Sequence, residues 1–122
     1  MAKPIINEVK ALNTFAQDTK INGDIDSDGD IRMDGIMVGN LDCKGRVVIG
    51  PVARIKGTIN ASNAEILGIV EGEISVIDLL SLKATAVITG DIIMGKLMVE
   101  PGASFTGNCR MNGGERSLPL TE

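Results

Sequence analysis

The stretch Ile88-Thr-Gly-Asp-Ile-Ile-Met94 alternates apolar and polar residues around a central glycine. The same order, a glycine followed by a polar residue and then an apolar one, occurs at six places in the chain. The six glycines are Gly23, Gly39, Gly57, Gly72, Gly90 and Gly107. They lie 15 to 18 residues apart, and a period of this length is typical of a solenoid, in which each repeat forms one turn.

The residues around each repeat glycine predict β-strands. Apolar side chains stand two residues before, two after and, in most repeats, four after the glycine, and this period of two indicates strands with one face in a core. Inward pairs such as Val47/Ile49, Leu80/Leu82 and Leu97/Val99 predict a third strand, and Ile66 takes this place in the shortest repeat. Small residues four before the glycine favour a tight corner there.

The repeats therefore predict an all-β fold, a parallel β-solenoid (β-helix) of about six turns of roughly 17 residues. Each turn has three short strands, and a stacking distance of about 4.8 Å makes the column roughly 29 Å tall. We expect three segments: a flexible N-terminal tail over residues 1–12, the β-helix domain over 13–111 and a flexible C-terminal tail over 112–122.

Composition narrows the function. The 122 residues include no histidine, which removes Ser-His-Asp and Cys-His pairs and three-histidine zinc sites, so we expect no enzyme and no cofactor or metal. The net charge of -4 argues against nucleic acid as a partner. No apolar run is long enough for a membrane-spanning helix or a secretory signal, which predicts a cytoplasmic protein.

Two further features of the sequence have ordinary structural interpretations. The acidic segment of residues 24–30 resembles the start of a calcium loop, but its twelfth place is Gly35 instead of glutamate, so we expect a solvated acidic turn. Cys43 and Cys109 lie close to four turns apart, nearly 20 Å along the column, too far for a disulfide. Both occupy inward positions, which predicts core residues.

Hexapeptide-like segments such as Val48-Ile-Gly-Pro-Val-Ala-Arg-Ile55 leave a left-handed β-helix as an alternative, although the catalytic histidines of such proteins are missing. A monomeric β-solenoid that binds one protein partner is a third possibility. Its candidate surface is an outward apolar stripe of Ile36, Ile69 and Val87, which share one position relative to the glycine. Val38 and Ile93 also point outward by parity.

The aligned repeats resemble those of the bactofilins, a bacterial cytoskeletal family. The similarity covers nearly all of residues 14–111, and its most specific part is the ending Pro101-Gly-Ala-Ser-Phe-Thr-Gly-Asn-Cys-Arg-Met111. The resemblance implies a right-handed β-helix that polymerises without nucleotide into non-polar filaments. It also implies a scaffold in the bacterial cytoplasm, often at the inner face of the membrane, for cell-shape, envelope or peptidoglycan-remodelling proteins.

The two ends of the solenoid are the predicted polymerisation surfaces, because end strands have unpaired backbone groups. The only aromatic residues, Phe15 and Phe105, fall in the first and last turns, where each either closes the core or also serves as a contact surface. The predicted interface consists of Phe15, Ile21, Ile25, Leu97, Val99, Phe105, Cys109 and Met111.

A weaker membrane contact is predicted in the N-terminal tail. Ile5, Ile6 and Val9 supply apolar area there, with Lys3 and Lys10 as the only cations. This anchor is thin, since stable attachment takes more buried area or a polybasic cluster.

Overall fold

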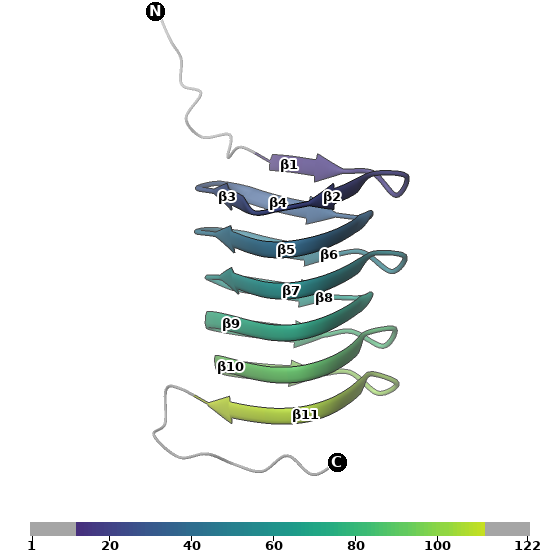
Figure 1. The fold of residues 1–122 in the computed structure, drawn as a ribbon. Helices are drawn as coiled ribbons and strands as arrows, with labels where there is room; N and C mark the ends of the chain where they lie inside the picture. The colour runs from purple at the N-terminus through teal and green to yellow at the C-terminus, as the bar shows by residue number, and fades with distance from the viewer. Residues whose placement is uncertain (1–11, 112–122) are drawn as a thin grey trace, which may run out of the picture.

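The regular structure of residues 12–111, the part of the chain that the computed structural model describes, consists of strands without any helix. All the strand pairings are parallel, and the turns stack into one column (Figure 1). The strands are β1 (Leu12–Phe15), β2 (Lys20–Asn22), β3 (Ile25–Ser27), β4 (Asp30–Met33), β5 (Ile36–Cys43), β6 (Arg46–Ile49), β7 (Arg54–Ala61), β8 (Asn63–Ile66), β9 (Ile69–Leu82), β10 (Val87–Val99) and β11 (Ser104–Met111).

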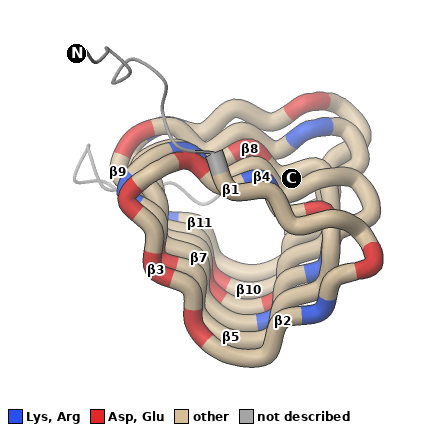
Figure 2. The backbone as a smooth tube through the Cα atoms, turned by 90° about the horizontal axis from the view of Figure 1, so that it is seen from above, with Lys and Arg blue, Asp and Glu red and all other residues tan. Residues whose placement is uncertain are grey.

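Each turn has three faces, visible in the view down the axis (Figure 2). Face A is the segment before each repeat glycine: β2 and residues 36–38, 54–56, 69–71, 87–89 and 104–106. Face B follows the glycine: β3 and residues 41–43, 59–61, 74–76, 92–94 and 109–111. Face C comprises β1, β4, β6, β8 and residues 80–82 and 97–99.

The coil is right-handed. In Figure 1 the front strands β5 and β7 run from right to left, β1 at the back runs from left to right, and the chain descends from turn to turn. Seen from the N-terminal end, the chain therefore turns clockwise as it recedes. This confirms the handedness that the family resemblance implied and excludes the left-handed alternative.

The repeat glycines stack on one another and bend the strands between faces A and B. Gly39 pairs with Gly57, and the ladder continues through Gly72 and Gly90 to Gly107. The φ angle of Gly57 is +142°, and a Cβ atom there would collide with the carbonyl oxygen of Gly39. Glycine is thus required both by the backbone angle and by the close approach of the turn above. The bend leaves β5, β7, β9, β10 and β11 continuous across the corner.

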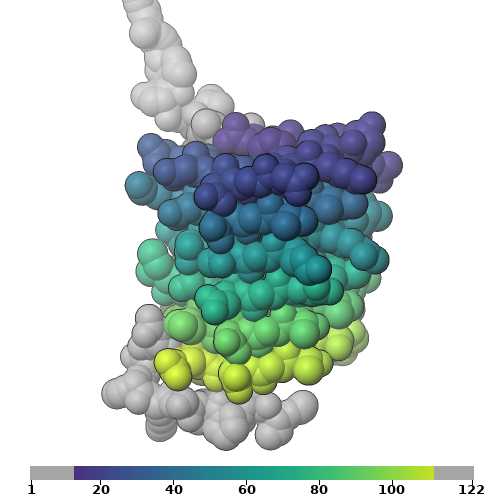
Figure 3. All heavy atoms as spheres, in the orientation of Figure 1, coloured from purple at the N-terminus to yellow at the C-terminus, as the bar shows by residue number. Residues whose placement is uncertain are grey.

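The core fills the column with aliphatic layers. Ile59 at the centre is fully buried between Leu41 above and Ile74 below, at the inward position of face B. On face C, Ile66 is buried between Ile49 and Leu82, which confirms its predicted place in the third strand. Figure 3 shows the turns as layers in contact along the front of the molecule.

The corners between faces C and A are of two kinds. Four of them are wide loops closed by a backbone hydrogen bond, as where the amide of Ala53 donates to the carbonyl of Gly50 (3.1 Å). Two are short, at Gly35 and Gly68, where a Cβ atom would collide with carbonyl groups of the turn above. The short corner at Gly68 matches the sequence expectation, whereas the one at Gly35 was not anticipated.

The strands begin at Leu12, one residue before the start expected from the repeats, and end at Met111. The segments 1–11 and 112–122 lie outside the described residues, so the predicted tails and the predicted membrane contact of Ile5, Ile6 and Val9 remain predictions. Within residues 12–111 there is no helix of the length and apolarity that crossing a membrane requires.

Candidate assembly surfaces

The N-terminal end of the column is an apolar plate with open strand edges. Among the described residues, β1 pairs only with β4, and β2 and β3 pair only with β5. Phe15, Ile21 and Ile25 project inward from these strands, are partly buried and pack against the core. Phe15 stands above Met33 in a column that ends at Val99, as its position before the first repeat glycine predicts.

The C-terminal end has the same construction. Strand β11 pairs only with β10, and residues 97–99 pair only with β9 within the described part of the chain. Phe105, below Ile88, is partly buried at the end of the face A column. Leu97, Cys109 and Met111 complete the layer and also pack against the core.

Val99 differs from its neighbours in this layer. It has the inward register of Leu82, yet 51% of it is exposed, because no strand of the described chain lies below it. The packed end layer also includes Ala103, which the sequence treated only as a small corner residue. The structure thus brings all eight predicted interface residues into two end layers, three at the N-terminal end and five at the C-terminal end.

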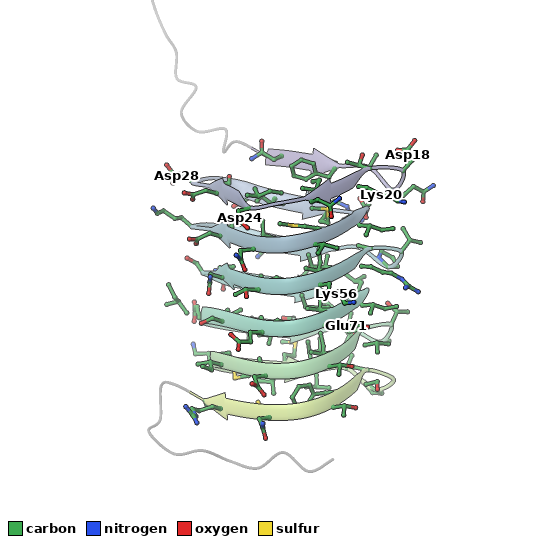
Figure 4. The ribbon with its side chains drawn as sticks, in the orientation of Figure 1. Asp18, Lys20, Asp24, Asp28, Lys56 and Glu71 are labelled. Atoms are coloured by element: carbon green, nitrogen blue, oxygen red, sulfur yellow. The ribbon has the colours of Figure 1, made fainter. Side chains whose placement is uncertain are left out.

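Charge distinguishes the two ends. Residues 12–30 contain five aspartates and one lysine, a net charge of -4 that equals that of the whole chain, whereas residues 31–111 carry eight charges of each sign. Asp18, Asp24 and Asp28 lie on the rim of the first turn, with Lys20 (Figure 4). Asp24 accepts hydrogen bonds from the backbone and side-chain amides of Asn40, at 3.1 and 3.2 Å, so the acidic segment also joins the first turn to the second.

The cysteines occupy inward positions, as expected, in two different environments. Cys43 is buried, and its thiol donates to the carbonyl of Gly29 (2.9 Å). Cys109 is only partly buried, in the C-terminal end layer. Burial raises the pKa of both thiols above the usual 9.0, which favours the neutral form and makes a reactive thiolate unfavourable.

Face A carries the predicted outward stripe. Ile36 and Val87 are 36% and 40% exposed, and Val38 on the same face is 45% exposed. Ile69 is only partly exposed and helps to line a shallow groove of about 200 Å³ that crosses β5, β7 and β9. Arg54 interrupts the stripe, as the alignment of repeats predicts.

The described residues contain no group of three or more Cys, Asp and Glu side chains that could hold a metal ion. The features that the structure does offer are two open apolar ends and one partly apolar lateral face. Together they define a right-handed β-solenoid suited to association with other proteins through its ends and one side.

Comparison with known proteins identifies the family. Residues 13–110 match the family model of the bactofilins, described as polymer-forming cytoskeletal proteins. The chain is 32% identical to Bactofilin BacO of Myxococcus xanthus over 96 residues, which cover 79% of this chain and 76% of BacO. It is 28% identical to Bactofilin BacP of the same organism over 91 residues, 75% of this chain but only 38% of BacP. The chain belongs to the bactofilin family.

A solved structure agrees with this assignment. The chain is similar to the Thermus thermophilus bactofilin seen by cryo-EM in double helical filaments, with a TM-score of 0.78 and 30% identity. The match covers 82% of this chain and 99% of the other. The sequence resemblance and the predicted fold class are therefore confirmed.

Proposed function

We propose that this bactofilin polymerises end to end, without nucleotide, into filaments that serve as a scaffold in the bacterial cytoplasm. The proposal is supported chiefly by the two open ends, where apolar residues lie beside strand edges that have no partner within the described chain. Such edges favour pairing with another chain. The contacts would be made by Phe15, Ile21 and Ile25 at one end and by the layer around Phe105 at the other.

The chemistry of the contact needs no energy source. Burial of apolar end plates is favourable by about 25 cal/mol for each Å² removed from water. The sequence has no Gly-x-x-x-x-Gly-Lys-Ser/Thr loop, and residues 12–111 offer no helix N-terminus for a phosphate. Assembly should therefore reach the same extent with or without ATP or GTP.

Pelleting of the purified protein at several concentrations, followed by negative-stain microscopy, tests the proposal. We expect filaments whose amount does not depend on nucleotide. A strict requirement for ATP or GTP would contradict the proposed mechanism, and small particles at all concentrations would favour a monomeric binding module.

The scaffold function adds partners to the polymer. Cell-shape, envelope or peptidoglycan-remodelling proteins are the partners that the family resemblance implies, and a filament would present a docking surface once per subunit. Peripheral membrane contact through Ile5, Ile6 and Val9 is the corresponding proposal for the N-terminal segment. Flotation of filaments with anionic vesicles in a density gradient tests it, with an Ile5→Ser/Ile6→Ser variant expected to stay at the bottom of the gradient but keep polymerising.

A further inference from the structure

The outward residues of face A form two columns, and several of their positions complement each other when the order of the turns is reversed. Its first outward column runs Lys20, Ile36, Arg54, Ile69, Val87 and Ser104. Its second outward column runs Asn22, Val38, Lys56, Glu71, Thr89 and Thr106. The midpoint of both columns lies between β7 and β9, the third and fourth of six turns. Lys56 and Glu71 flank this midpoint on adjacent strands (Figure 4).

A second copy can be placed against this surface by a two-fold axis. The axis lies in the plane of the contact, parallel to the strands and between β7 and β9. This rotation reverses the order of the turns in the second copy. A residue of the first turn then faces the sixth turn, one of the second faces the fifth, and one of the third faces the fourth. Lys56 then faces Glu71 of the second copy, Ile36 faces Val87 and Val38 faces Thr89. Ile36 and Val38 thus meet an apolar side chain and a threonine methyl, Arg54 lies opposite Ile69 without facing a like charge, and the symmetric contact forms two ion pairs.

The parallel arrangement lacks this complementarity. A two-fold axis along the column sets residues of the same turn opposite one another. Arg54 then meets Lys56 of the other copy, and Glu71 meets Ile69. Like charges placed face to face at a contact disfavour it, so the antiparallel arrangement is the favoured one.

We propose that face A joins two filaments side by side, with facing subunits antiparallel about the axis between β7 and β9. This inference rests on the proposed end-to-end polymerisation. The related Thermus thermophilus bactofilin forms double helical filaments, so we assign a second strand of the same chain as the occupant of this face. Lys56 and Glu71 are accessible, since their side chains are 70% and 54% exposed. They form an ion pair with each other within one subunit (4.0 Å), and the lateral contact exchanges this pair for two pairs between the copies.

The size of the face explains why the pairing needs the polymer. A surface about 29 Å tall and about 10 Å wide buries roughly 300 Å² per copy, well below the about 800 Å² per partner of a stable complex. Free subunits should therefore stay unpaired. Filaments repeat the contact at every subunit, and the linked contacts together give lateral affinity that a single one lacks.

Charge reversal tests the contact. Lys56→Glu sets a carboxylate opposite Glu71 of the second copy, and Glu71→Lys sets two cations opposite each other. Each variant alone should still pellet as filaments but lose double strands, which cryo-EM class averages count directly. Preformed filaments of the two variants, once mixed, should pair with each other, because every contact then joins opposite charges. No effect within one chain can produce that result.

Two controls sharpen the experiment. Lys44→Glu makes the same charge change on the side of face B, where the ammonium group of Lys44 forms an ion pair with the exposed Asp28 (3.6 Å), and it should leave the double strands intact. A Val38→Cys/Thr89→Cys variant in a Cys109→Ala background should give disulfide-linked dimers. These two sites lie three turns, about 14 Å, apart within one chain, too far for an internal bond.

The outcomes separate the two proposals. Double strands that persist in both charge variants, or dimers formed by Val38→Cys alone, would overturn the antiparallel contact while leaving end-to-end assembly in place. A wild-type protein that forms no filaments would overturn the proposed function, and the lateral contact with it. Single filaments from each charge variant together with paired ones from the mixture would establish face A as the lateral contact.

Discussion

Phe105→Lys is the most direct perturbation of the C-terminal end. Phe105 ends the inward column of face A below Ile88 and is only partly buried, since no strand of the described chain covers it. A lysine side chain cannot leave its ammonium group in this apolar layer, so the charge would turn toward the open end. The inner turns should still stack, because each turn of a solenoid depends mainly on its neighbours.

The expected loss of polymer can be estimated from the position of the charge. If two C-terminal ends meet, the substituted charges face each other inside an apolar contact with no partner. An unpaired buried charge costs about 3–5 kcal/mol, and 1.4 kcal/mol corresponds to a tenfold change in an equilibrium constant. The concentration needed for assembly should therefore rise by at least two orders of magnitude.

Sedimentation and circular dichroism of the same samples measure this effect. Phe105→Lys should keep the β-sheet spectrum but remain in the supernatant at concentrations where the wild type pellets. Ile59→Val is the matched control, because it changes a fully buried residue in the middle of the column and should leave assembly unchanged at a cost of about 0.5–1.5 kcal/mol in stability.

Two results would refute the reasoning in different ways. Long filaments from Phe105→Lys at wild-type concentrations would remove the C-terminal turn from the interface. Loss of the β-sheet spectrum would show that Phe105 is needed for folding, so that the absence of filaments says nothing about the contact itself.

Two other predictions concern the core and the end layer. Ile59→Ala should lower the free energy of unfolding by about 2–5 kcal/mol, and Thr58→Ala should change it by no more than about 0.5 kcal/mol; equal losses in denaturant melts would place the inward register one residue away. Cys109 should react with iodoacetamide in the dissociated Phe105→Lys variant and be protected in wild-type filaments. Because burial raises its thiol pKa above 9.0, the labelling rate should still be rising with pH beyond that value; equal labelling of polymer and subunit would exclude Cys109 from the contact.

The repeat and its register could be predicted from the sequence because the stacked glycines lie too close to the turn above for a side chain to fit. From Gly39 to Gly107 each repeat glycine lies against the carbonyl of the glycine in the turn above, so no other residue fits and the positions are visible without a structure. Alternation on either side of the glycine then assigns inward and outward side chains, and this assignment holds for Ile59 in the core and for Val38 on the surface. The end layers follow from the first and last repeats.

The features that the sequence did not reveal depend on contacts between turns. Gly35 looks like a small corner residue, and only the structure shows it beneath the carbonyls of Ala16 and Thr19 in a wide loop. Val99 has the alternation of a core residue, but it is exposed because no strand of the described residues lies below it. Handedness also cannot be obtained from spacing alone, since right- and left-handed coils place the same residues inward.

The inward and outward columns of this solenoid are subject to different demands, and that difference locates function. Inward residues must fill layers of nearly constant size, so their columns repeat aliphatic side chains from Met37 to Ile88 with little variation. Outward residues do not have to fill a core layer. An outward column in which residue types still follow a regular order therefore indicates a constraint other than packing of the core. The Arg54 and Lys56 turn looks like an interruption of the apolar stripe when one chain is considered alone. In the proposed lateral contact Lys56 complements Glu71 of the reversed second chain, while Arg54 lies opposite Ile69. Because this contact and the end contacts use different residues, they should respond to separate substitutions.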